Sequence, residues 1–153
     1  AVRDDVSNLL HQLLDIMNQM YKLLHDIQHR NSQLQYYIKT ENHNAITALV
    51  DENNDTFESL SELKFEESRT KEALAAILGI NIDKLSKRFK EENIAIWNEI
   101  HETQASIFIL MESVHEQNKV IIAKMESLKS TIHNDIRGMQ VTLKWYKKKE
   151  EYL

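Results

Sequence analysis

The feature that most constrains this sequence is its shortage of residues that break helices. Its 153 residues include no proline and only two glycines, Gly79 and Gly138. Because proline and glycine form most tight turns, a chain with so few of them has few turns and long elements. The leucine, isoleucine, lysine, glutamate and glutamine that the chain contains favour helix, whereas an all-β or βαβ fold needs more turn residues. The sequence therefore predicts an all-α fold.

Apolar residues recur at alternating steps of four and three along the first part of the chain. This spacing places them on one face of a helix and is typical of a coiled-coil seam. Other apolar residues flank the seam, so the stripe is wide enough to touch two neighbouring helices, which favours a bundle. The seam consists of Val6, Leu10, Leu13, Met17, Met20, Leu24, Ile27, Asn31, Leu34 and Ile38.

Two further apolar stripes follow. The second stripe runs from Ile46 to Leu78, is preceded by the N-cap candidates Asn42 and Asn44, and ends at Gly79. A glycine in that place fits the left-handed residue that closes many helices. The predicted helices span about 3–39, 44–78 and 83–150. The third stripe consists of Trp97, Ile100, Gln104, Ile107, Met111, Val114, Asn118, Ile121, Met125, Leu128 and Ile132.

The lengths of these helices and of their connections predict an architecture. Short connections make successive helices antiparallel neighbours. At 1.5 Å per residue the first two helices would each be roughly 50 Å long, and a continuous third helix would be roughly 90 Å. We therefore predict one domain over residues 1–153, an antiparallel three-helix bundle of long, coiled-coil-like helices. Its third helix would extend past the other two from about residue 128.

Polar residues interrupt the apolar seams at three positions: Asn31, Gln104 and Asn118. A buried asparagine within a helical seam fixes the register and orientation of the partner helix at some cost in stability. We expect this structural role at all three positions.

Beyond about residue 125, the third helix would lack cover from the first two. Apolar patches of this kind usually mark an interaction surface. Self-association and folding back at Gly138 remain alternative ways to cover the same residues. The candidate partner-binding residues are Met125, Leu128, Ile132, Ile136, Met139, Leu143, Trp145 and Tyr146.

Metal-binding and catalytic patterns are weak in this sequence. His25 and His29 stand one helical turn apart, a spacing that can hold a metal, but no third ligand accompanies them. Glu112 and His115 form one E-x-x-H, whereas a di-iron bundle needs two such motifs and two more glutamates. We interpret His25 and His29 as surface residues of a helix, and we expect no metal site and no cofactor.

The composition argues against several other classes of function. The chain has no cysteine and hence no thiol nucleophile, and isolated glycines cannot form a phosphate-binding loop. A net charge of −5 disfavours general nucleic-acid binding. No apolar run approaches the ~18 residues of a membrane span. The lysines of "KWYKKKEEYL" (144–153) are interpreted as solvating a helix end, although such a run can also touch RNA or an anionic membrane. We expect the protein not to be an enzyme.

Two stretches of the sequence resemble the FlgN family of bacterial flagellar type III secretion chaperones. The first is residues 45–79, in which an E-x-x-R-like stretch from Glu66 to Arg69 precedes an apolar run that ends in Leu78–Gly79. The second is "VHEQNKVI" (114–121), which is similar to the family's V-x-E-x-N-x-x-(I/L) pattern.

The resemblance implies a small, acidic, cytoplasmic helical protein. Members of the family bind the C-terminal helices of two hook–filament junction proteins, FlgK and FlgL, keep them unassembled and present them to the export apparatus. The resemblance also implies that the client binds between about Leu128 and Tyr146, and that Tyr146 or Tyr152 docks at the export gate. We expect no nucleic-acid binding and no stable membrane insertion, and we leave a weak homodimer open. The alternative function is a self-associating coiled-coil module.

Overall fold

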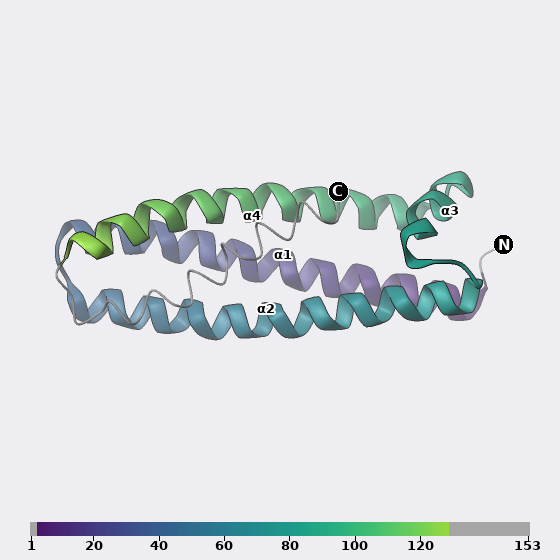
Figure 1. The fold of residues 1–153 in the computed structure, drawn as a ribbon, viewed down its shortest axis with the longest axis horizontal. Helices are drawn as coiled ribbons and strands as arrows, with labels where there is room; N and C mark the ends of the chain where they lie inside the picture. Colours follow the sequence, from purple (N-terminus) through teal and green to yellow (C-terminus); the bar gives the residue numbers. More distant parts are fainter. Residues whose placement is uncertain (1–2, 129–153) are drawn as a thin grey trace. The chain divides into compact units, whose positions relative to one another are not determined.

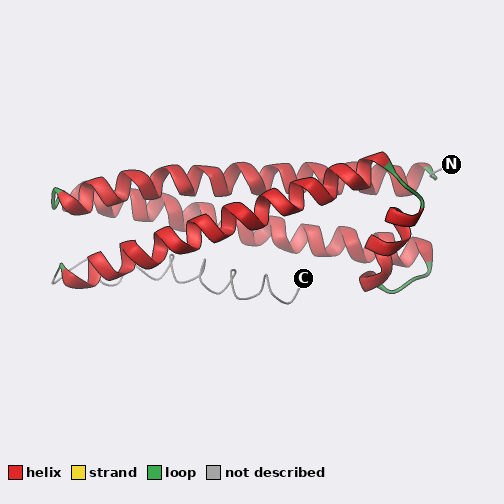
Figure 2. Ribbon diagram, turned by 90° about the horizontal axis from the view of Figure 1, so that it is seen from above, coloured by secondary structure: helices red, strands yellow, loops and turns green. Residues whose placement is uncertain are grey.

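The structure is a computed structural model, and it describes residues 3–128. Helices make up nearly all of this part of the chain (Figure 1). No strand occurs between residues 3 and 128, where short loops join the helices (Figure 2). The predicted all-α class is therefore confirmed. The elements in order are α1 (Asp4–Lys39), α2 (His43–Leu78), the 3-10 helix η1 (Ile82–Lys84), α3 (Leu85–Glu91) and α4 (Ala95–Ser127).

The first two helices begin and end within one residue of their predicted bounds. All ten residues of the predicted seam in α1 are buried. At the start of α2, the backbone N–H of Ala45 donates to Oδ1 of Asn42 at 3.2 Å, so Asn42 is an N-cap as predicted. Gly79 has a φ of +66° and adopts the predicted left-handed conformation after α2.

The predicted third helix over 83–150 is wrong in its first part, because the chain leaves the helical conformation between α3 and α4. Asn93 has a φ of +50°, and its N–H donates to the carbonyl of Lys90 at 3.1 Å. The N–H of Ile94 donates to the carbonyl of Phe89 at 3.3 Å. These two bonds form a Schellman motif, which closes a helix and turns the chain. α4 ends at Ser127, and the predicted helical residues 129–150 lie outside the described residues.

The chain divides into two compact units, and each long helix contributes to both. Unit 1 comprises Ser61–Ile107 and the described residues of Ala1–Tyr21; unit 2 comprises Lys22–Leu60 and the described residues of Phe108–Leu153. The predicted single domain over residues 1–153 stays a prediction. None of the helices formed by residues 3–128 is long and apolar enough to cross a membrane.

Unit 1 includes the break between α3 and α4. The rings of Phe89 and Trp97 lie on either side of this break, with their centroids 5.0 Å apart. Both side chains are buried, as is Leu85 at the start of α3. The short helix α3 therefore contributes apolar side chains to the core of unit 1.

Unit 2 has an apolar core to which three helices contribute. Tyr37, Leu49, Ile122 and Leu128 are partly buried and pack against this core. The buried members of the cluster are Leu34 and Ile38 from α1, Ile46 and Val50 from α2, and Ile121 and Met125 from α4.

Candidate functional site

A layer of polar side chains lies within the helices of unit 2 and is its most distinctive feature. Asn31, Asn53 and Asn118 come from α1, α2 and α4, and each is almost completely buried. Nδ2 of Asn31 donates to Oδ1 of Asn118 at 2.8 Å, and Oδ1 of Asn31 accepts from Nδ2 of Asn53 at 3.1 Å. One asparagine thus joins all three helices by hydrogen bonds. Because a buried amide without partners is costly, these bonds favour one alignment of the helices.

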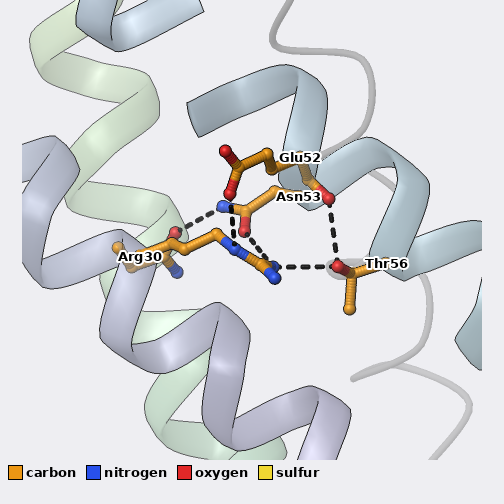
Figure 3. A network of polar contacts seen from close by, with 5 residues as sticks. Arg30, Glu52, Asn53 and Thr56 are labelled. Carbon is orange, nitrogen blue, oxygen red and sulfur yellow. Dashed lines mark hydrogen bonds and ion pairs between the residues drawn. The ribbon is translucent and has the colours of Figure 1, made fainter. Parts of the chain in front are cut away.

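Arg30 extends this layer toward α2 (Figure 3). Its Nη1 donates to Oδ1 of Asn53 at 3.2 Å and to Oγ1 of Thr56 at 2.8 Å. Its Nε lies 3.2 Å from Oε2 of Glu52, whose side chain remains 61% exposed. The hydroxyl of Thr56 also donates to the backbone carbonyl of Glu52 at 3.0 Å. The guanidinium therefore holds a buried amide, a hydroxyl and a surface carboxylate of the same helix.

A second set of polar contacts joins α1 to α4. Nε2 of Gln28 donates to Oγ of Ser113 at 2.8 Å, while Nε2 of Gln117 donates to the backbone carbonyl of Gln28 at 3.3 Å. Nδ2 of Asn31 also donates to Oε1 of Gln117 at 3.3 Å. These amides and hydroxyls fix geometry, because none of them transfers protons near neutral pH.

The layer confirms the predicted roles of Asn31 and Asn118 and adds Asn53, which was not predicted. Asn31 and Asn118 are buried and bonded to each other, as expected of polar residues that set a register. Gln104 is only half-buried. Asn53 was missed, although its spacing gave a signal: it lies seven residues from both Ile46 and Leu60, so it occupies an equivalent position in the apolar stripe of α2.

The structure corrects the first of the predicted partner-binding residues, Met125. Met125 is only 1% exposed and belongs to the core cluster of unit 2, so the expectation that cover ends near residue 125 is wrong. The insertion of η1, α3 and the break delays α4, so Met125 still lies beside core residues of α1 and α2. Leu128 is half-buried against the same cluster. Ile132, Ile136, Met139, Leu143, Trp145 and Tyr146 lie outside the described residues, as does Tyr152.

The histidine and carboxylate patterns do not gather into a metal site in the part of the chain that the structure describes. No group of three or more histidine, aspartate or glutamate side chains placed to hold a metal ion occurs between residues 3 and 128. His25, His29 and Glu112 are exposed, and His115 is buried.

Unit 1 holds a buried charge that the sequence did not reveal. The side chain of Glu67 is 4% exposed, and its Oε1 lies 3.4 Å from Nζ of Lys64 and 3.0 Å from Nζ of Lys71. All three residues belong to α2, at spacings of three and four. This local pairing allows the carboxylate to be buried in a stretch that reads as polar surface.

Some apolar side chains of the described residues face water instead of a core. The most exposed are Ile109 at 71%, Phe65 at 63% and Tyr36 at 62%. The guanidinium carbon of Arg69 lies 5.7 Å from the centre of the Phe65 ring, which partly shields that ring. Ile109 and Val120 are exposed on α4.

Comparison of the chain with protein-family models, curated proteins and solved structures finds no match in any of the three.

Proposed function

We propose that this protein is a cytoplasmic export chaperone that binds helices and catalyses no reaction. Its clients would be the amphipathic C-terminal helices of flagellar hook–filament junction proteins, FlgK and FlgL. It would keep these clients from assembling early and deliver them to the type III export apparatus. The resemblance of residues 45–79 and 114–121 to the FlgN family supports this proposal, and the helices formed by residues 3–128 are compatible with it.

The observation that carries the proposal is that the apolar pattern continues past the end of α4. α4 ends at Ser127. The sequence then places Ile136, Met139 and Leu143 at steps of three and four. A client helix can lay its own apolar face against such a stripe. Met139 would add a pliable contact that adapts to more than one client.

We further propose that the helices of unit 2 form an antiparallel three-helix bundle. Asn31 bonds to Asn53, and residues 34–38 share a cluster with residues 46–50, so the numbers in α2 fall as those in α1 rise. Gln28 bonds to Ser113 and Asn31 to Asn118, so the numbers in α4 rise with those in α1. These pairings support α2 running opposite to both α1 and α4.

Self-association as a coiled-coil module is the second candidate. The observation in its favour is the exposure of Ile109 and Val120 on α4. A second copy could bury these side chains without any client. Single exposed apolar residues are common on protein surfaces, however, and two of them make a small interface.

Titration calorimetry of the full chain with a synthetic client helix tests the proposal. We expect Ile136→Asp to weaken binding roughly tenfold or more, because it places a charge in an apolar contact. Ile109→Asp is the matched control, since it makes the same change at an exposed position of α4. The proposal fails if the unaltered chain does not bind either client helix. It also fails if both variants weaken binding equally.

A further inference from the structure

The large apolar side chains that unit 2 exposes come from two of its three helices. Among the described residues of this unit they are Tyr36 of α1 and Ile109 and Val120 of α4. Gln28 and Ser113 mark the line along which α1 and α4 meet, because their side chains bond at 2.8 Å. The positions of the exposed side chains relative to this line show whether they share one face.

Both apolar residues of α4 lie beside the contact line. At 100° per residue, Ile109 lies about 40° and Val120 about 20° around the helix from Ser113. The two are eleven residues apart in the sequence, so about 16 Å separates them along the helix axis. A stripe of this length matches roughly three turns of another helix.

Tyr36 lies on the corresponding flank of α1. It is about 80° around the helix from Gln28 and about 120° from Arg30, which bonds to α2. It therefore points to the side of α1 that borders α4. The surface that carries Tyr36, Ile109 and Val120 is called the α1–α4 face below.

Two exposed lysines, Lys39 and Lys124, also lie on the α1–α4 face. Each follows a residue at the contact line by eleven positions, which places it about 20° around its helix from that residue. Their neighbours Ile38 and Met125 belong to one core cluster, so the lysines lie at the same end of unit 2. Neither lysine pairs with a carboxylate of residues 3–128.

The helices place the carboxylates of unit 2 away from this face. Asp26, the acidic residue that α1 contributes to unit 2, lies about 160° around the helix from Gln28. On α4 the nearest carboxylate is that of Glu116, about 60° from Ser113 at the outer edge of the face. It is paired with Lys119 at 3.4 Å. The α1–α4 face thus combines exposed apolar groups with lysines that have no acidic partner among the described residues.

We infer that the α1–α4 face binds an amphipathic helix of another protein, one whose apolar stripe is flanked by aspartates and glutamates. The exposed apolar side chains would contact the stripe, while Lys39 and Lys124 would pair with the carboxylates beside it. Such a helix would lie along the contact line and become a further helix of unit 2. The inference goes beyond the proposed function and does not rest on it, because the proposed client site consists of other residues.

Charge favours this partner over the other candidates. In a two-fold dimer each copy presents the same patch, which here would bring the lysines of both copies together. The α2 helix of a second copy offers Asp51, Asp55 and Glu58 in unit 2, but residues 43–60 expose no large apolar side chain. Residues 129–153 contain six lysines and arginines against three aspartates and glutamates, so they have the wrong charge. The net charge of −5 disfavours RNA.

Titration calorimetry of the full chain with three designed peptides tests the inference. The first peptide repeats leucine at heptad spacing with glutamates on both sides of the stripe. The second has lysine in place of every glutamate, and the third has the composition of the first in scrambled order. We expect the first to bind and the others to bind roughly tenfold more weakly or less, because one loses the complementary charge and the other the stripe. No binding of the first peptide, or equal binding of the first and third, would overturn the inference.

Substitutions in the chain test the location of the site. We expect Lys124→Glu to weaken binding of the acidic peptide roughly threefold and Val120→Asp roughly tenfold. The matched controls are Lys119→Glu, about 120° around α4 from Ser113, and Ala48→Asp on α2, both at exposed positions. Each control makes the same change of net charge as its test variant, so equal losses would overturn the inference.

The competing occupants give distinct results, and each would overturn the inference. A dimer of the full chain that Val120→Asp dissociates would show that a second copy covers the face. Binding of single-stranded RNA that Lys124→Glu weakens would show a nucleic-acid surface. Displacement of the acidic peptide by the client helix would show that both use one site. By contrast, a chain that binds the acidic peptide but no client helix would contradict only the proposed chaperone function.

Discussion

At the scale of single residues, Asn31 shows how a polar group can determine the packing of an apolar core. Its side chain donates to Asn118 and Gln117 and accepts from Asn53, so both ends of the amide are satisfied inside unit 2. An apolar residue at this position would pack in several registers. Asn31 makes all of these hydrogen bonds in only one register.

Replacing Asn31 should therefore cost more than the bonds it makes. We expect Asn31→Ala to lower the free energy of unfolding by about 1–3 kcal/mol, because Asn53 and Asn118 each lose a partner while buried. Urea unfolding followed by circular dichroism measures this loss. Ser32→Ala, at an exposed neighbour, is the control. A loss no larger than that of the control would show that the layer does not stabilise unit 2.

The contacts of Arg30 predict different losses of stability for two substitutions. Arg30→Met should destabilise the protein by about 1–3 kcal/mol, because Asn53 loses a donor to its buried oxygen. Glu52→Gln should cost less than about 1 kcal/mol, since that side chain is mostly exposed and its ion pair is screened by water. Denaturant midpoints of the two variants compare the costs directly. A larger effect for Glu52→Gln would contradict this account.

At the scale of the elements, left-handed residues close three helices that have no proline to end them. Glu41, Gly79 and Asn93 have φ values of +53°, +66° and +50°, and each follows the last turn of α1, α2 or α3. Only the glycine adopts this conformation without a steric penalty, because it has no Cβ atom. The other two ends therefore carry some backbone strain.

This strain predicts opposite effects of two substitutions. Gly79→Ala should destabilise the protein by about 1–2 kcal/mol through its φ alone, because no atom lies within 4 Å of the added methyl group. Asn93→Gly should be neutral or stabilise it by up to about 1 kcal/mol. Thermal unfolding followed by circular dichroism compares the two. A stabilising Gly79→Ala would show that the helix end relaxes in solution.

The short helix α3 gives a prediction about unit 1. Phe89 is buried against Trp97, so Phe89→Ala should cost about 3–5 kcal/mol. It should also change the fluorescence of Trp97, which loses its aromatic neighbour. Lys87→Ala, in an exposed part of the same helix, should change neither. If Phe89→Ala costs as little as Lys87→Ala, α3 does not contribute to the core of unit 1.

The sequence predicted these elements unevenly, for physical reasons. The bounds of α1 and α2 followed from apolar periodicity and caps, which are local signals. The break before α4 did not, because an asparagine in the left-handed conformation looks no different from one within a helix. The burial of Met125 was missed for the same reason. Because α4 starts later than predicted, its contacts with α1 and α2 also continue further along the sequence. The hydrogen bonds around Asn31 depend on three helices meeting, which the apolar stripe of a single helix does not encode.

At the scale of the whole molecule, the proposed function requires that the chain use its apolar residues in two ways. The buried apolar residues from Val6 to Met125 pack within the chain's two units. The apolar residues that follow in the sequence would bind a client helix. In a self-associating module, the apolar residues after Leu128 would instead pack against a second copy of the chain.

Sedimentation velocity of the full chain, alone and with an equimolar client helix, tests the central claim most directly. The chaperone account predicts a monomer or weak dimer alone and a single one-to-one complex with the helix of either hook–filament junction protein. A tight dimer whose sedimentation the client helix does not change would contradict the account.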